Sequence, residues 1–341
     1  MPEPRFLVVR LGALGDIVHT FPAVAALRES FPAAYITWLT HPRWDFLVRS
    51  SGLASEVLTV ETRVLSSLRK VIGRVRQDSW TAAIDYQGLW KSAALPFFSG
   101  LTRRIGFSSI NVREFGVPVL YTERVTSSKA HIAEQNGDLS RQAGSRRGTA
   151  RISLQIPELA KSTVRSLLRA QGLERYIVLS PGGGWRSKCW PAERFGILSR
   201  MLRESLGLRC VVNLGPGEDD LAAALVRASG DAVPLVYRGD LSQLMALLCA
   251  ADCIVAGDTG PLHLAAALDT RTVAIFGPTD PARNGPYRVA EPAPHGSKDV
   301  VLRASGVTTT HERASQPHPA ILSISVDQVF QAVTRCIGAA T

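Results

Sequence analysis

Hydrophobic positions along the chain fall into short apolar runs that alternate with longer stretches of helical spacing. A β-branched apolar run at 5–10 is followed by a glycine-containing loop at 11–15. Residues 17–30 then place their apolar side chains on one face of a helix. A second apolar run follows at 35–39. This order of strand, helix and strand predicts a parallel sheet with right-handed crossovers.

The same alternation continues along the chain. In the first half it predicts further strands at 57–60, 82–86 and 104–107. In the second half it predicts strands at 176–180, 209–214, 253–256 and 272–276, and helices at 192–206, 221–229, 241–250, 261–268 and 327–337. The polar, arginine-rich stretch 142–151 is expected to be a loop near a domain boundary. Residues 296–319 have little pattern, so we expect a mobile linker there.

Composition narrows the class of protein. A chain of 341 residues suits two α/β domains, and 45% hydrophobic with 20% charged residues is typical of a globular protein. The formal charge of +10 favours an anionic partner, such as a phosphorylated substrate or an acidic lipid surface. The chain has no zinc-finger spacing and no RNP-like aromatic motif, so we expect no nucleic-acid partner.

Targeting signals and cysteine spacing bear on the compartment. No apolar run reaches the ~18 residues of a membrane span. Arg10 and Asp16 interrupt the apolar N-terminus, which therefore does not read as a signal peptide. The five cysteines form no CxxC pair. We expect a cytoplasmic protein with reduced thiols and no metal site, able to touch a membrane surface.

The loop after the first strand ends in Asp16. Because open α/β sheets bind ligands at the carboxyl ends of their strands, this loop is expected to face a cleft. It lacks GxGxxG spacing, and no acid ends the second strand, which argues against a nicotinamide enzyme. Asp16 has two interpretations, a helix N-cap or a general base, and the sequence does not separate them.

The residues Gly-Asp-Thr-Gly-Pro-Leu-His at 257–263 follow a buried strand and open a helix. The glycines allow a ligand to approach the backbone, and Pro261 suits a first helical turn. Free N–H groups at such a helix start bind phosphate. The other interpretation is an ordinary turn in which Asp258 caps the helix.

Two more glycine-rich loops follow strands in the second half. Residues 181–188 combine three glycines with Arg186 and Lys188, which suits a polyphosphate, although the order is not that of a Walker motif. Residues 215–220 contain three acids, and an acid there could hold ribose hydroxyls. The alternatives are a solvated cationic loop and a helix start enriched in acids.

Residues 63–76 combine apolar side chains at helical spacing with five cations. Such a basic amphipathic helix can lie on an acidic membrane or bind an anionic acceptor. The other interpretation is a packed helix with a solvated charged face.

Together these segments resemble glycosyltransferase family 9. The Gly-Ala-Leu-Gly-Asp sequence at 12–16 is similar to that family's first loop. Residues 258–268 are similar to its donor-site signature, and 276–281 to the segment that follows it. Residues 83–94, and Lys188 before Trp190, are similar to the members that add heptose to the lipopolysaccharide inner core. The resemblance spans nearly the whole chain.

The resemblance implies an α/β, GT-B fold, in which two Rossmann-like domains with parallel sheets face an inter-domain cleft. It places an acceptor-binding domain at 1–160, a donor-binding domain at 170–320 and a helix at 321–341 that crosses back to the first domain. It implies inverting, metal-independent transfer of heptose from ADP-heptose to Kdo-lipid A, without a cofactor, on the cytoplasmic face of the inner membrane. Transfer of another sugar or at another core position, and sugar-nucleotide 2-epimerisation, are the alternatives.

The resemblance also implies roles for individual residues. Asp16 would be the catalytic base, and Lys188 would stabilise the departing ADP. The implied donor-binding residues are Gly183, Gly184, Glu218, Asp219, Asp258, Thr259, Gly260 and His263. The implied acceptor-binding residues are Gly15, Arg63, Lys91, Arg113 and His131.

Overall fold

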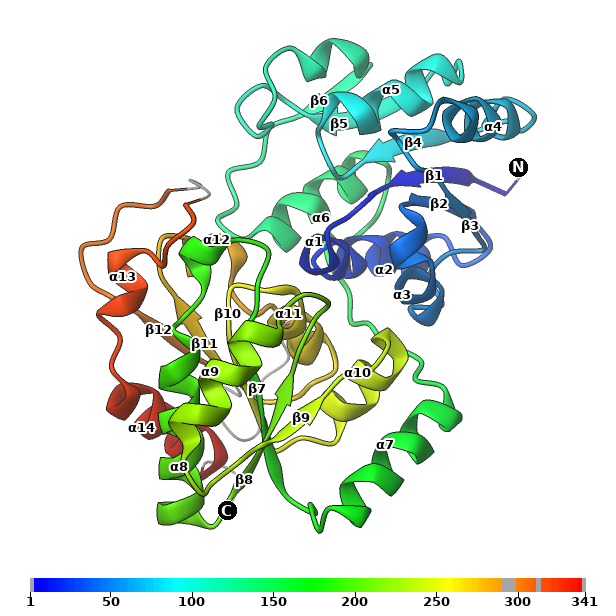
Figure 1. The fold of residues 1–341 in the computed structure, drawn as a ribbon. Coiled ribbons are helices and arrows are strands. Elements are labelled where there is room, and N and C mark those ends of the chain that lie inside the picture. The colour runs from blue at the N-terminus through cyan, green and yellow to red at the C-terminus, as the bar shows by residue number, and fades with distance from the viewer. Residues whose placement is uncertain (1–2, 290–298, 311–313, 339–341) are drawn as a thin grey trace. The chain divides into compact units, whose positions relative to one another are not determined.

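The computed structural model describes residues 3–289, 299–310 and 314–338. The chain divides into two compact units, Met1–Gln155 and Ile156–Thr341. Each unit has one six-stranded sheet with helices packed on it (Figure 1), and every strand pair is parallel. The α/β class predicted from the alternation of strands and helices is confirmed.

The first unit orders its sheet as β3-β2-β1-β4-β5-β6. Its strands are β1 (Arg5–Val9), β2 (Tyr35–Thr40), β3 (Glu56–Thr59), β4 (Ala82–Asp85), β5 (Arg104–Phe107) and β6 (Glu123–Val125). Its helices are α1 (Leu14–Val18), α2 (Phe21–Ser30), α3 (Asp45–Ser50), α4 (Leu65–Val75), α5 (Trp90–Phe98) and α6 (Ile132–Gln142), with the 3₁₀ helices η1 (Pro42–Trp44) and η2 (Val117–Leu120). The central strand β1 is buried from Phe6 to Val9, which explains its unbroken apolar run.

The second unit repeats this topology in the order β12-β11-β10-β7-β8-β9. Its strands are β7 (Tyr176–Ser180), β8 (Arg209–Asn213), β9 (Leu235–Tyr237), β10 (Cys253–Gly257), β11 (Thr272–Phe276) and β12 (Asp299–Arg303). Its helices are α7 (Glu158–Ala170), η3 (Arg186–Lys188), α8 (Ala192–Leu206), α9 (Asp219–Ser229), α10 (Leu241–Cys249), α11 (Gly260–Ala267), α12 (Pro281–Asn284), α13 (Pro319–Leu322) and α14 (Val326–Gly338).

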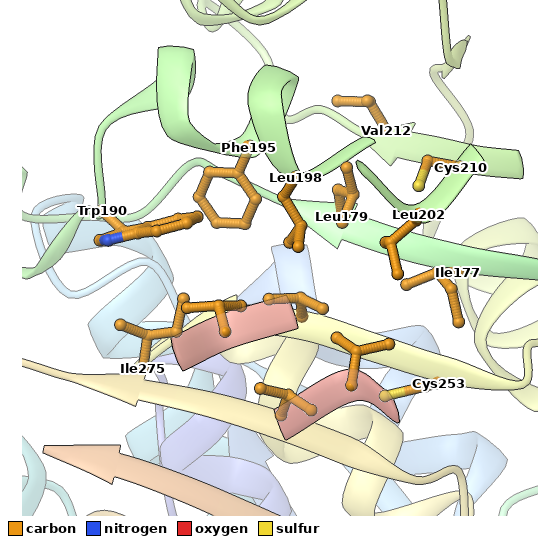
Figure 2. Close-up of a cluster of buried hydrophobic side chains, with 14 of the residues drawn as sticks. Ile177, Leu179, Trp190, Phe195, Leu198, Leu202, Cys210, Val212, Cys253 and Ile275 are labelled. Atoms are coloured by element: carbon orange, nitrogen blue, oxygen red, sulfur yellow. The ribbon is translucent and has the colours of Figure 1, made fainter. Parts of the chain in front are cut away.

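Helices α8 and α14 cover one face of the second sheet. Phe195 and Leu198 of α8 pack with Leu179 of β7 in a large buried cluster (Figure 2). Trp190, just before α8, meets the edge of the Phe195 ring at a centroid distance of 5.0 Å, and its Nε1 donates to the carbonyl of Ile324 at 2.9 Å. This buried tryptophan therefore ties the start of α8 to the segment that leads into α14.

The final helix belongs to the second unit. Its apolar stripe, which includes Val329, Val333 and Cys336, is buried against α8 and against β10, β11 and β12. The crossing of a helix at 321–341 to the first domain stays a prediction; within the second unit, α14 packs on the sheet. The same amphipathic period would suit either position, and the sheet face beside β11 supplies the apolar surface that the stripe needs.

Three strands, β6, β9 and β12, were not predicted. Each lies at an edge of its sheet and is only partly buried, and its apolar run is at most three residues long, too short to predict a strand. Strand β12 lies within the expected linker 296–319, of which 296–298 and 311–313 lie outside the described residues. The single helix predicted at 17–30 is two helices, because α1 ends at Val18 and α2 begins at Phe21.

Phe195→Ala tests the packing of α8 on the second sheet. The ring is buried and contacts Trp190, so its removal leaves a cavity and is expected to lower the free energy of unfolding by about 3–5 kcal/mol. Denaturant unfolding of the full chain measures the change. Leu159→Ala is the control, because that side chain is exposed on α7 and its loss is expected to cost at most about 0.5 kcal/mol.

Candidate active site

The strand order of each sheet reverses at one point. In the first unit β1 lies between β2 and β4, and in the second unit β7 lies between β8 and β10. Loops that leave neighbouring strands diverge at such a point, which is where open α/β sheets bind ligands. Asp16 follows β1, Lys188 follows β7 and Asp258 follows β10. The topology therefore places each of these three residues at the reversal point of its own sheet.

Asp258 is the centre of a buried ion-pair cluster in the second unit. Its Oδ2 accepts a hydrogen bond from Lys188 Nζ at 2.6 Å, and its Oδ1 lies 3.1 Å from His263 Nε2. The side chain of Asp258 is 6% exposed and that of Lys188 16%. The sequence placed these three residues in two separate motifs, and the fold brings them into direct contact.

The protonation state of Asp258 follows from these contacts. Burial acts to raise the pKa of the carboxyl, but the hydrogen bond and charge of His263 and the ammonium of Lys188 outweigh it and hold the pKa well below its usual range. The carboxylate is therefore ionised and fixes the Lys188 ammonium. An ammonium has three N–H donors, so Lys188 keeps donors for a second anion.

Two glycine loops approach each other closely beside this cluster. A Cβ built on Gly182 would lie 1.9 Å from Glu218 Oε1, so the Glu218 carboxylate occupies the space beside this glycine and would have to move for any larger residue. Glu218 precedes α9, and its Oε2 accepts from the N–H of Gly215 at 2.6 Å. Gly183 lies beside Thr259, whose Cγ2 would be 3.0 Å from a Cβ at that position. The donor loops predicted after β7, β8 and β10 are thus adjacent.

Not every predicted donor residue lies in this group. Asp219 is exposed in the first turn of α9 and pairs with Arg238. Gly184 is also exposed, and no atom lies within 4 Å of a Cβ built there. The exposed Asp219 fits the alternative interpretation of an acid that favours the start of a helix.

The start of α11 has the features of an anion site. Thr259 is the N-cap residue, yet its side chain makes no capping hydrogen bond. Its Oγ1 is buried and has no hydrogen-bond partner among the described residues. Gly260 begins the helix, whose first-turn N–H groups and dipole favour an anion. Asp258 precedes the N-cap position, so the interpretation of Asp258 as the helix cap is wrong.

Two further side chains in loops of the second unit were not singled out from the sequence. Lys188 Nζ lies 4.3 Å from the centroid of the Trp185 ring, a cation–π contact that steadies the ammonium. Thr279, in the loop after β11, has a fully buried Oγ1 without a hydrogen-bond partner among the described residues. The only sequence signals for these positions were the segments that contain them. Trp185 lies in the glycine-rich loop 181–188, and Thr279 lies in the Phe-Gly-Pro-Thr-Asp-Pro segment 276–281.

In the first unit, Asp16 pairs with a buried arginine. Asp16 Oδ1 lies 2.8 Å from Arg10 Nη2, and the two side chains are 45% and 7% exposed. Asp16 is the third residue of α1 and its Oδ2 accepts from the N–H of Ala13 at 3.1 Å, so it supports the helix start without being the N-cap. The carboxylate is thus oriented and accessible, which the base interpretation requires.

The carboxylate of Asp85, at the end of β4, accepts four hydrogen bonds. It accepts from the hydroxyls of Tyr121 at 2.7 Å and Ser92 at 2.8 Å, and from the N–H groups of Gln87 and Gly88. Burial raises the pKa of this carboxyl, and the four donors oppose that rise. Gln87 Oε1 accepts from the Leu11 N–H at 2.7 Å, so Asp85 helps to hold the first loop in place.

The predicted acceptor residues follow different strands of the first sheet. Gly15 lies in α1 after β1, Arg63 follows β3, Lys91 lies in α5 after β4, Arg113 follows β5 and His131 follows β6. All therefore belong to the carboxyl edge of the sheet, and Arg63, Lys91 and Arg113 are exposed. His131 is the N-cap of α6 and meets the ring of His19 edge-on at 5.2 Å, which joins the edge of α6 to the end of α1.

Helix α4 confirms the predicted amphipathic segment. Val71 and Val75 are buried, whereas Arg69 and Lys70 are exposed. Arg74 differs from its neighbours, because it pairs with Glu56 at 3.2 Å and with Asp78 at 2.6 Å. Arg76 donates to the Phe98 carbonyl at 2.6 Å, so two of the five cations are engaged within the unit.

Two searches of the described residues were negative. Among residues 3–289, 299–310 and 314–338, His, Cys, Asp and Glu side chains do not gather in groups of three or more that could hold a metal ion. In the same ranges no helix is long and apolar enough to cross a membrane.

The family is settled by a match over residues 68–294 to the model of glycosyltransferase family 9, described as heptosyltransferase. The chain belongs to glycosyltransferase family 9. It is 28% identical to lipopolysaccharide heptosyltransferase 1 of Escherichia coli K12, over 88% of this chain and 93% of that one. It is 26% identical to the protein of the same name from Pseudomonas aeruginosa, over 83% and 81%.

Solved structures have the same fold as this family 9 glycosyltransferase. A family 9 glycosyl transferase from Veillonella parvula superposes with a TM-score of 0.82 at 20% identity and covers 99% of this chain and 98% of its own. The E. coli heptosyltransferase WaaC with ADP superposes with a TM-score of 0.77 at 24% identity and covers 97% and 99%. The two six-stranded sheets described above are therefore those of a GT-B enzyme.

Asp258→Asn tests the ion-pair cluster of this family 9 enzyme. The amide leaves the Lys188 ammonium without its counter-charge, so the free energy of unfolding is expected to fall by about 3–5 kcal/mol in denaturant unfolding. Asp219→Asn removes an exposed carboxylate from the same unit and is expected to cost at most about 1 kcal/mol. Equal losses in the two variants would contradict a central role for Asp258.

Proposed function

We propose that this chain transfers heptose from ADP-heptose to Kdo-lipid A in lipopolysaccharide inner-core synthesis, with inversion at the anomeric carbon. The observation that supports it most is the contact of Asp258, Lys188 and His263 beside the start of α11, a site suited to a diphosphate. Membership of family 9 and the names of the relatives support the sugar and the pathway.

The second unit holds the donor in this proposal. Backbone N–H groups at the start of α11, the Thr259 hydroxyl and the free donors of Lys188 would bind the diphosphate. The same groups would stabilise the negative charge that develops as ADP leaves, so the proposed reaction needs no metal or other cofactor. Glu218 and the glycines at 182–184 would shape the rest of the donor site, with backbone N–H groups as donors.

The first unit supplies the base in this proposal. A sugar hydroxyl is a weak nucleophile, so a carboxylate must take its proton as the bond to the anomeric carbon forms. Asp16 is exposed enough to reach a substrate, and Arg10 and the Ala13 N–H orient it. Arg63, Lys91, Arg113 and His131 would bind the anionic acceptor along the same edge of the sheet.

The acceptor sets the place of action. Kdo-lipid A is a membrane lipid, so the enzyme would work as a peripheral protein on the cytoplasmic face of the inner membrane. The relatives include lipopolysaccharide heptosyltransferase 3 of E. coli, at 24% identity, which keeps transfer at another core position as the second candidate.

A nucleotide screen tests the donor. ADP is expected to raise the melting temperature more than UDP or GDP at equal concentration, because selective binding to the native state stabilises it. Lys188→Met is expected to abolish most of the ADP shift. Equal shifts with all three nucleotides, or a preference for UDP, would overturn the ADP-heptose donor and leave the fold unaffected.

Asp16→Asn tests the base. The asparagine Oδ1 can still accept from the Ala13 N–H, so the helix start is kept while the proton acceptor is lost. Turnover with ADP-heptose and Kdo-lipid A is expected to fall by about 10²–10⁴, which is roughly 3–5 kcal/mol of barrier. ADP binding is expected to remain.

The matched control is Asp45→Asn. Asp45 is also a carboxylate in the first turn of a helix of this unit and also pairs with an arginine, Arg49 at 2.8 Å. Its replacement is expected to leave kcat unchanged. A kcat near that of the wild type in Asp16→Asn, with a normal melting temperature, would rule out Asp16 as the base.

A further inference from the structure

Exposed aromatic side chains are concentrated on one part of the first unit. Of the described residues, Trp90, Phe97, Phe98 and Phe115 are the exposed Trp and Phe side chains, and all four lie on α5 or in the loop before η2. Phe115 is 98% exposed and Phe98 58%. The exposed large apolar residues of the second unit are Leu and Val, spread over several elements. A concentration of this kind marks an interaction surface.

Direct contacts link these residues in pairs. Trp90 Nε1 donates to the Phe115 carbonyl at 3.2 Å, and the rings of Phe97 and Phe98 meet edge-on at 5.3 Å. Helix α5 also packs against η2, whose Val119 is 65% exposed. We call these five residues the α5–η2 face.

Cations border the α5–η2 face. Arg76 donates to the Phe98 carbonyl at 2.6 Å, and the guanidinium of Arg104 lies 5.3 Å from the centroid of the Phe97 ring. Arg124 donates to the Pro118 carbonyl within η2 at 2.9 Å. Lys91 directly follows Trp90, and Arg113 lies two residues before Phe115. Both cations are exposed.

The acid nearest to the face is engaged. Glu114 precedes Phe115 and accepts from the backbone N–H of Trp90 at 2.7 Å. A backbone N–H leaves this carboxylate charged, but the five cations named above outnumber it, so the border of the face is predominantly positive. Helix α4, which packs beside α5 (Figure 1), adds the exposed Arg69 and Lys70.

We propose that the α5–η2 face docks the enzyme on an anionic phospholipid bilayer, with its aromatic side chains in the interface and its bordering cations on the lipid phosphates. Trp and Phe insert at the boundary between headgroups and acyl chains, and Lys and Arg bind the negative surface around them. Both chemistries are present on α5, η2 and the residues that contact them.

Charge decides between a bilayer and a second copy of this chain. Two copies that joined through the α5–η2 face would bring their bordering arginines and lysines together, and like charges across an interface are unfavourable. An anionic bilayer pairs with the same cations. The proposed lipid acceptor gives such docking a purpose, because Lys91 is the second residue of α5, where the face meets the acceptor edge of the sheet.

The test is sedimentation of the full chain with vesicles that contain no glycolipid. The wild type is expected to bind vesicles of phosphatidylcholine with phosphatidylglycerol, and to bind pure phosphatidylcholine more weakly. Raising the salt to about 0.5 M is expected to weaken binding, because it screens the attraction. Combined Phe98→Ser, Phe115→Ser and Val119→Ser is expected to weaken binding at least about tenfold, since inserted apolar side chains are lost.

The matched control replaces three exposed apolar residues of the second unit, Leu159, Val233 and Val301, with Ser. It is expected to bind vesicles as the wild type does. Unchanged melting temperatures show that both variants fold. Equal binding by the α5–η2 variant and the wild type, equal loss in the control, or no binding by the wild type would overturn the proposal.

Light scattering without vesicles tests whether a second copy of this chain binds the α5–η2 face instead. A wild-type dimer that the three serines convert to a monomer, together with no vesicle binding, would assign the face to self-association and overturn the proposal. Because the vesicles carry no acceptor and the assay needs no donor, its result is independent of whether the chain transfers heptose.

Discussion

The buried carboxylate of Asp258 organises the second unit at the point where its strand order reverses. It sits after β10, faces the loop after β7 through Lys188 and faces α11 through His263. A buried charge is tolerated only when it is paired, so these contacts are obligatory once Asp258 is placed there. They also leave the Lys188 ammonium fixed beside a helix start, where an anion is favoured.

The two units share one topology but carry groups of opposite charge preference at the point where the strand order reverses. At its reversal point the second unit offers an ammonium, a helix N-terminus and a hydroxyl, which together suit an anion. At the corresponding point the first unit offers the carboxylate of Asp16, held by Arg10. The buried Asp85 ends the neighbouring strand β4 and accepts from four donors, so it acts as a support for the first loop. The proposed transfer would use both kinds of group, one for the leaving diphosphate and one for the attacking hydroxyl.

The charge of the chain is also distributed in ways that its total does not reveal. The formal charge is +10, yet Arg10, Arg74 and Lys188 neutralise carboxylates within their own units. Other cations remain exposed on α4, and Arg76 and Arg104 contact members of the α5–η2 face. An anionic binding partner is thus favoured by the exposed cations of the first unit as well as by the total charge of the chain.

The sequence alone determined the class of fold, most of the central strands and helices, and the loops that bear the site. Buried parallel strands are continuous apolar runs, so β7 and β11 were predicted with their observed limits, and α8 was predicted from its helical spacing. The edge strand β9 is only three residues long, so its apolar run was too short to be distinguished as a strand. The family motifs pointed to Asp16, Lys188 and Asp258 in the same way, because each follows a strand.

Only the tertiary structure decided which of these residues act together. Lys188 and Asp258 are separated by 70 positions, and no local pattern records their contact. Asp16 proved to be the third residue of its helix with Arg10 as its partner, because α1 begins at Leu14. The position of α14 and the α5–η2 face were also decided at this level. Amphipathic periodicity states that a helix needs an apolar neighbour, whereas the packing of distant segments decides which neighbour it receives and which apolar side chains stay exposed.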